Sequence, residues 1–107
     1  SLKVHHGSIK SICYIINKKC AYAPDVNYID SKDLRFLKNL KYFIIDCLRY
    51  NYHPTHFNLD DLLKLIRKVK PQKTILTNLS NEIDYHEIKK KLPKNVIPAH
   101  DGLTVLI

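Results

Sequence analysis

Short apolar runs alternate along this chain with segments of helical period, and this alternation limits the folds open to it. Three strand-like runs come first, at residues 2–5, 9–17 and 20–23. Two more follow at residues 41–48 and 74–78, each preceded by a segment whose leucines recur at helical spacing. Strands that alternate with helices are typical of α/β folds, in which helices cross between neighbouring strands. The sequence therefore predicts an α/β fold with a mixed sheet and helices on one face.

Capping residues indicate where the helices begin. Asp30 or Ser31 can cap a helix over about residues 32–39, and Asn58 caps the next helix. Asp84 and Glu87 form a capping box that opens a third helix. The tail of the chain predicts two further short strands around a turn.

Length and composition indicate one domain of an ordinary globular protein. The 107 residues fit a single structural unit, which we assign to 1–107. The net charge of +8 favours polyanionic partners and keeps a small basic nucleic-acid-binding module open as an interpretation. The lysines, however, are spread along predicted helix faces and turns, where charge is ordinarily solvated. Three cysteines without CxxC spacing, no run of membrane length and no signal-peptide pattern predict a cytoplasmic protein.

Polar residues near the ends of the predicted strands are the candidate site. His6 ends the first strand and Asp25 follows the third, and an imidazole with a carboxylate suits a metal ion. His53 and His56 flank a proline in HPTH, so one oriented histidine is favoured there over a shared metal. Each residue also has an ordinary interpretation: an edge residue at His6, a turn cap at Asp25, and a helix entrance at His56.

Five segments occur in order and without large gaps: VHHGSIKSICY, CAYAPDV, IIDCLRYNYHPTHFNLDDLL, TILTNLSNEIDY and LPKNVIPAHDGL. Together they resemble the C-terminal half of metallo-beta-lactamase-fold hydrolases. The most similar branch contains the phosphodiesterase of the carbon-phosphorus lyase pathway. The resemblance covers nearly the whole chain, and it implies half of an αββα sandwich of four layers.

The resemblance also implies roles for single residues. His6 matches a histidine that ligates one metal of a dinuclear site, and Asp25 matches an aspartate that bridges the two metals, which are zinc or manganese in the family. His56 matches a histidine placed to donate a proton to the leaving alkoxide of a phosphodiester. Asn78 stands where the family has a ligand histidine.

The family's other half carries an HxHxDH motif that supplies most of the metal ligands. A catalytic metal normally has at least three protein ligands, so we expect His6 and Asp25 alone to hold zinc or manganese only weakly. We therefore expect a fragment of a metal-dependent phosphodiester hydrolase that is inactive by itself. A folded remnant without catalysis, self-associated as a dimer, is the alternative.

One face of the predicted sheet has no helix to cover it. An exposed apolar patch of more than a few hundred Å² on a small protein indicates a missing partner. We expect either a homodimer through this face or pairing with a separately encoded N-terminal half. The residues expected on it are Ile12, Tyr14, Ile16, Ile44, Ile75 and Leu76.

Overall fold

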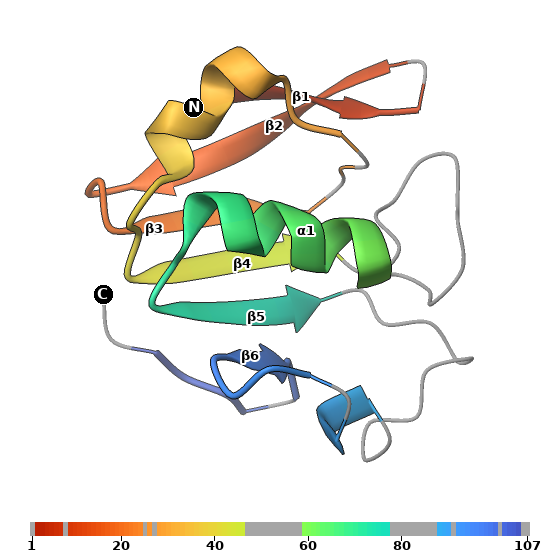
Figure 1. The fold of residues 1–107 in the computed structure, drawn as a ribbon. Coiled ribbons are helices and arrows are strands. Elements are labelled where there is room, and N and C mark those ends of the chain that lie inside the picture. The colour runs from red at the N-terminus through yellow and green to blue at the C-terminus, as the bar shows by residue number, and fades with distance from the viewer. Residues whose placement is uncertain are drawn as a thin grey trace.

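The computed structural model shows a six-stranded sheet within its described part, with the strands in chain order (Figure 1). The described residues are 2–7, 9–24, 26, 28–46, 59–77, 88–90, 92–100 and 102–105. The elements are β1 Leu2–His6, β2 Ile9–Ile16, β3 Cys20–Ala23, η1 Ser31–Leu37, β4 Tyr42–Asp46, α1 Leu59–Val69, β5 Lys73–Thr77 and β6 Val96–Pro98.

Two tight turns make the first three strands antiparallel. Gly7 has a positive φ of 65° between β1 and β2, a conformation that glycine adopts without steric cost. Asn17 and Lys18 have φ values of 52° and 57° in the turn between β2 and β3. The amide of Lys19 closes this turn by donating to the carbonyl of Ile16 at 3.0 Å. The hairpin predicted at residues 9–23 is confirmed.

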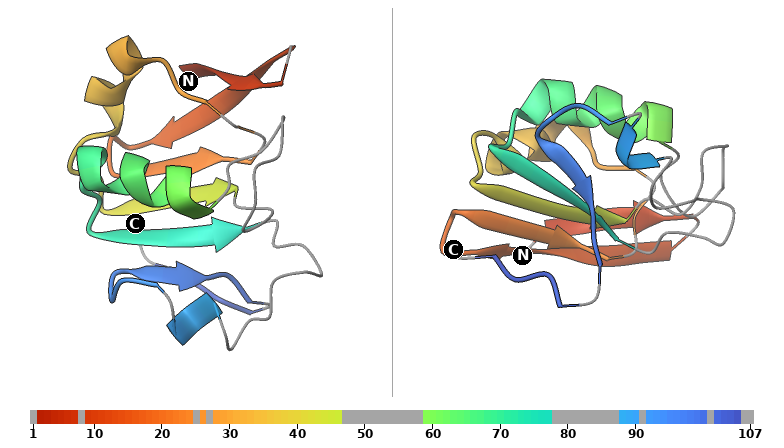
Figure 2. Two further views of the ribbon diagram at one scale, coloured as in Figure 1. Left: turned by 45° about the vertical axis from the view of Figure 1, so that its right-hand side comes forward. Right: turned by 90° about the horizontal axis from the view of Figure 1, so that it is seen from below.

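The remaining strands are parallel, because helices carry the chain back between them. β3, β4, β5 and β6 pair in parallel, so the sheet is mixed as predicted. Seen from below, η1 and α1 lie on the same side of the sheet (Figure 2). Apolar residues of both sheet and helix form the core between them, among them Phe43 and Ile45 of β4 and Leu62 of α1.

The opposite face of β2 and β3 is open. Ile12, Tyr14, Ile16 and Tyr22 are exposed by 43%, 48%, 42% and 39%, and we call these four residues the open face. Tyr14 and Tyr22 are paired across the two strands, as are Ile16 and Cys20, so the exposed side chains share one side of the sheet. The apolar face predicted from the sequence is thus present on these strands.

Several local expectations differ from the structure. Leu76 and Ile75 were both expected on the uncovered face, but side chains alternate along β5 and Leu76 is fully buried in the core beneath the helices. Ile75 is buried as well, with an exposed fraction of 3%. The helix expected over 32–39 is the 3-10 helix η1, and it ends before Asn39, whose φ is 60°. No strand is assigned at residues 102–105, where the tail was expected to form one. Every helix in the described ranges is too short or too polar to span a lipid bilayer.

Candidate metal site

The strands that precede the candidate ligands in the sequence all end at one edge of the sheet. β1 is antiparallel to β2, and β2 is antiparallel to β3, so β1 runs in the same direction as β3, β4 and β5 (Figure 1). Their carboxyl ends therefore share an edge, the usual location of chemistry in α/β proteins. β1 ends at His6, β3 ends two residues before Asp25, and β5 ends immediately before Asn78.

Of these candidates, the structure describes His6. It is the last residue of β1, partly buried, and it precedes the left-handed Gly7 that turns the chain into β2. Asp25, His56 and Asn78 lie outside the described residues. Within the described ranges no group of three or more His, Cys, Asp or Glu side chains could hold a metal ion. The metal site at His6 and Asp25 therefore stays a prediction from the family resemblance.

His5 forms a cluster that the sequence did not predict. Its Nε2 lies 3.0 Å from Oδ1 of Asp30, and its ring centroid is 5.4 Å from that of Tyr28. Nζ of Lys10, its partner across β1 and β2, lies 3.2 Å from Nδ1. Nζ of Lys10 is also 3.2 Å from Nε2, and because a carboxylate can only accept, Nε2 is the donor in the contact with Asp30. His5 and His6 are adjacent in β1, and neighbouring residues of a strand face opposite sides of the sheet.

The contact with His5 has an electrostatic consequence for Asp30. The hydrogen bond from His5 to the carboxylate holds the pKa of Asp30 below its ordinary value, and the Lys10 and Lys32 charges act in the same direction. Both side chains remain partly exposed, at 27% for His5 and 35% for Asp30. The carboxylate is accordingly ionised at neutral pH and oriented toward β1.

The two described cysteines do not belong to the candidate site. Cys13 and Cys20 are free and buried. Burial raises the pKa of Cys13 to about 11 and also raises that of Cys20. A neutral buried thiol is a poor nucleophile and a poor metal ligand, so both cysteines serve packing. Cys47 lies outside the described residues.

Comparison with known proteins identifies the family. The model of the beta-lactamase superfamily domain matches residues 1–77. The chain belongs to this superfamily. It has the metallo-beta-lactamase fold that the five sequence segments predicted, and relatives in this superfamily are metal-dependent hydrolases.

Solved structures support the assignment over almost the whole chain. A diphosphatase from the PhnP family superposes with a TM-score of 0.93 at 30% identity, covering 98% of this chain and 41% of that one. The metallo-beta-lactamase fold protein YhfI of Bacillus subtilis superposes with a TM-score of 0.72 at 16% identity, covering 95% of this chain and 46% of that one. Because its identity is low, YhfI supports the fold alone.

One curated relative places a similar segment in a longer protein. An octanoyltransferase of Porphyromonas gingivalis is 27% identical over 108 residues, which are 99% of this chain and 22% of that protein. The chain thus spans about a fifth of that relative and less than half of each solved structure.

Proposed function

We propose that this chain supplies one half of the active site of a metal-dependent phosphoester hydrolase. The observation that carries the proposal is the shared edge at which β1, β3 and β5 end. His6 is the last residue of β1, and in the sequence Asp25 follows β3 and Asn78 follows β5. The similarity to a diphosphatase, 30% identical over 98% of the chain, favours a phosphate compound as the substrate class. Residues 1–107 then form a single unit of a larger domain.

Each candidate residue has a chemical task in this proposal. His6 and Asp25 are ligands of a divalent metal, zinc or manganese, with the carboxylate suited to bridging two ions. A bound divalent metal would supply Lewis acidity and a water of lowered pKa. His56 protonates the leaving alkoxide as the general acid. Asn78 has an amide where a further ligand imidazole would complete the set, which weakens metal binding from this half.

Activity therefore requires ligands that come from elsewhere. Two protein ligands are fewer than the three that catalytic metals normally have. We infer that the complementary half, which carries the HxHxDH motif, supplies the remaining ligands, either on the same polypeptide or on a separate one. Without it, we expect residues 1–107 to be inactive.

The open face gives this complementary half a place to bind. The helices η1 and α1 cover one side of the sheet (Figure 2), and the four exposed side chains of the open face alternate along β2 and β3 with residues buried in the core. A second copy of this chain would cover apolar area but would bring no HxHxDH motif. The complementary half satisfies both requirements, so we propose it as the occupant of the open face, and self-association is the competing outcome.

Reconstitution tests the proposal. The chain, fused to or mixed with an HxHxDH-bearing half, should hydrolyse bis(p-nitrophenyl) phosphate with Mn²⁺, while the chain alone should not. His6→Ala, Asp25→Ala and His56→Ala should each abolish most of this activity. Asn78→His should raise Mn²⁺ affinity by adding a ligand.

Lys3→Ala is the matched control, because Lys3 lies on the same strand as His6 but on the opposite face. Elemental analysis of the chain alone, purified without added metal, should find less than one metal per molecule. Stoichiometric metal in the isolated chain, or undiminished activity in His6→Ala, would overturn the proposal. A reconstituted pair that associates without any hydrolysis would favour the non-catalytic remnant.

A further inference from the structure

Lysines that are far apart in the sequence meet where the parallel strands begin. We call this surface the basic edge, and its lysines are Lys18, Lys19, Lys38, Lys41, Lys70, Lys73 and Lys94. They lie in the turn before β3 and in the segments that lead into β4, β5 and β6, at the other end of the strands from the candidate metal site (Figure 1). Backbone hydrogen bonds join these segments: the amide of Lys41 donates to the carbonyl of Lys19 at 2.7 Å, and the amide of Thr74 donates to the carbonyl of Asn95 at 2.9 Å. The fold therefore collects charges that the sequence distributes over several turns.

Acidic residues lie toward the other end of the strands. The described acids are Asp30, Asp33, Asp46, Asp60 and Asp61. Asp46 ends β4, and the other four precede or begin η1 and α1, which both start after the carboxyl end of a strand and return the chain to the basic edge. Within the described ranges, no lysine of the basic edge forms an ion pair, and all of them except Lys41 are exposed. Positive charge gathered in this way attracts polyanions.

The backbone of the basic edge is strained in a way that folding alone does not favour. Among the described residues, every non-glycine with a left-handed φ lies in these turns: Asn17 at 52°, Lys18 at 57°, Asn39 at 60° and Lys70 at 52°. Asparagine tolerates this conformation, whereas lysine adopts it at a steric cost that glycine avoids. Lys18 and Lys70 therefore supply positive charge while lowering stability, and residues in strained backbone conformations cluster at binding sites.

The side chains next to these lysines favour nucleic acid over a lipid surface as the partner. Asn17, Asn39, Gln72 and Asn95 each adjoin a lysine of the basic edge in the chain, and all four are exposed. Amide side chains donate hydrogen bonds to phosphate and sugar oxygens in nucleic-acid complexes. A protein surface that enters a lipid headgroup layer instead carries large apolar side chains beside its lysines. The basic edge thus has the polar composition of a surface that binds a phosphate backbone.

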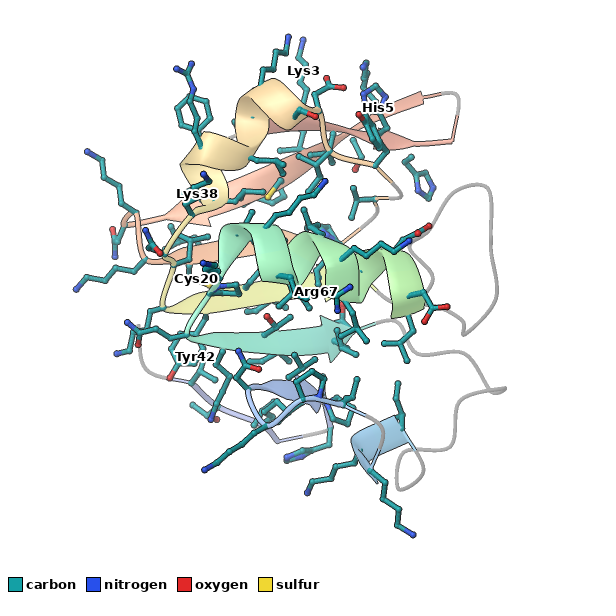
Figure 3. The ribbon with its side chains drawn as sticks, in the orientation of Figure 1. Lys3, His5, Cys20, Lys38, Tyr42 and Arg67 are labelled. Atoms are coloured by element: carbon teal, nitrogen blue, oxygen red, sulfur yellow. The ribbon has the colours of Figure 1, made fainter. Side chains whose placement is uncertain are left out.

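A hollow of about 340 Å³ opens beside Lys70, between the end of α1 and the segment before β6. It is lined by Leu63, Ile66, Arg67, Lys70, Pro71, Pro93 and Asn95. Leucine, isoleucine and proline form much of this lining, and Arg67 reaches it from α1, where Figure 3 labels this residue. A nucleobase has a flat face that stacks on a guanidinium plane and an edge that hydrogen-bonds to an amide. Because only an unstacked base can enter a hollow, this shape favours a single strand over a duplex.

We propose that the basic edge binds single-stranded nucleic acid, with its lysines along the phosphate backbone and one base in the hollow beside Arg67. Neighbouring strands lie about 4.8 Å apart, so the row of strand starts from Lys19 to Lys94 extends over about 15 Å. That length accommodates several phosphates. The proposal does not depend on the proposed function, because the basic edge and the edge at which β1 ends are at opposite ends of the strands. The bound strand is a partner of the chain and not a substrate at the candidate metal site.

Fluorescence anisotropy tests the proposal with a labelled oligouridylate of about 12 nucleotides and, in parallel, an oligothymidylate of the same length. The logarithm of the association constant should fall with the logarithm of the salt concentration with a slope of about −3, which corresponds to about four neutralised phosphates of a single strand. The triple variant Lys19→Ala, Lys41→Ala and Lys73→Ala should reduce this slope by about 2 and weaken binding on the order of 100-fold at about 0.1 M salt. Binding of either oligonucleotide supports the proposal, and the tighter one identifies RNA or DNA.

A triple variant of equal net charge is the matched control. Lys32→Ala, Lys64→Ala and Lys90→Ala remove three exposed lysines that lie outside the basic edge. Together they should weaken binding by less than about threefold, because charges more than about 10 Å from the bound strand are largely screened at this salt concentration. Equal losses in the two triple variants would show that net charge alone attracts the oligonucleotide, and this result would overturn the proposal.

Two single substitutions separate binding from folding, and the base from the phosphates. Lys70→Gly should weaken oligonucleotide binding about fivefold while raising the unfolding free energy in urea denaturation, because it removes a charge and relieves a left-handed lysine. Arg67→Lys keeps the charge but loses the planar guanidinium, so it should weaken oligonucleotide binding and leave the binding of inorganic polyphosphate unchanged. Equal affinity of the chain for polyphosphate and for the oligonucleotides would overturn the proposal, as would binding to phosphatidylserine vesicles without binding to either oligonucleotide.

Discussion

Replacing Tyr14 with serine is expected to weaken association through the open face far more than it weakens the fold. A buried tyrosine covers about 200 Å², and Tyr14 is 48% exposed, which leaves on the order of 100 Å² for a partner to cover. At about 25 cal/mol per Å², that area contributes about 2.5 kcal/mol to association. Its loss corresponds to roughly 60-fold weaker binding.

The same substitution should lower the unfolding free energy of the chain much less than it lowers the free energy of association. Tyr14 lies directly opposite Tyr22 in the register of β2 and β3, and such cross-strand pairs contribute roughly 0.2 to 1 kcal/mol. Tyr14→Ser should therefore lower the unfolding free energy of the chain by about 1 kcal/mol, to which the lower strand propensity of serine also contributes. Urea denaturation of the monomer measures this cost separately from association.

Sedimentation equilibrium provides the association measurement. It should be made on the chain mixed with the HxHxDH-bearing half and, in parallel, on the chain alone across a concentration series. Phe36→Ser is the matched control, since Phe36 is 46% exposed but lies on η1, outside the open face. Equal weakening by Phe36→Ser, or no weakening by Tyr14→Ser, would refute the assignment of the open face as the interface. Association of the chain with itself, and not with the other half, would identify a homodimer.

Four further substitutions test the packing and titration arguments. Thr74→Val should stabilise the chain by about 1 kcal/mol in urea denaturation, because the buried Oγ1 of Thr74 has no hydrogen-bond partner among the described residues. Lys70→Gly should stabilise it by about 1 kcal/mol, since Lys70 has a φ of 52° just after α1, whereas Lys68→Gly inside the helix should cost about as much. Burial raises the pKa of Cys13 from 9.0 to about 11, so the folded state keeps this thiol protonated where the unfolded chain loses the proton. The stability from this group is present below pH 9 and lost as the pH rises toward 11, and Cys13→Ala should show a smaller decline over that interval.

Much of the fold was open to prediction because the signals for it are local. The alternation of apolar residues in 9–16 and the leucine stripe of 59–69 fix a strand and a helix from side-chain periodicity alone. A turn with asparagine at a left-handed position follows from the short-range preferences of that residue. The sequence predicted a helix at residues 32–39 but not its type. Leucines at helical spacing do not distinguish an α-helix from the 3-10 helix that forms.

The candidate site was predictable only as far as the family resemblance reached. His6 was identified from the HG pair before a long strand, and its position at the end of β1 agrees with the predicted strand end. His5 was set aside, because adjacent residues of a strand face opposite sides and nothing in the sequence relates residue 5 to residue 30. A contact between residues so distant in the chain depends on the path of the segment after β3.

By itself, the sequence determined the order of the strands as far as β6, the family, and the identity of the candidate ligands. The tertiary structure decided which strand ends share an edge, and which side chains of β2 and β3 remain uncovered. It also decided that the side chain of Asp30 makes no capping hydrogen bond to η1 and accepts one from His5 instead. The physical reason is range: periodicity and capping act over a few residues, whereas strand pairing, burial and the contacts of His5 join residues that only the folded chain brings together.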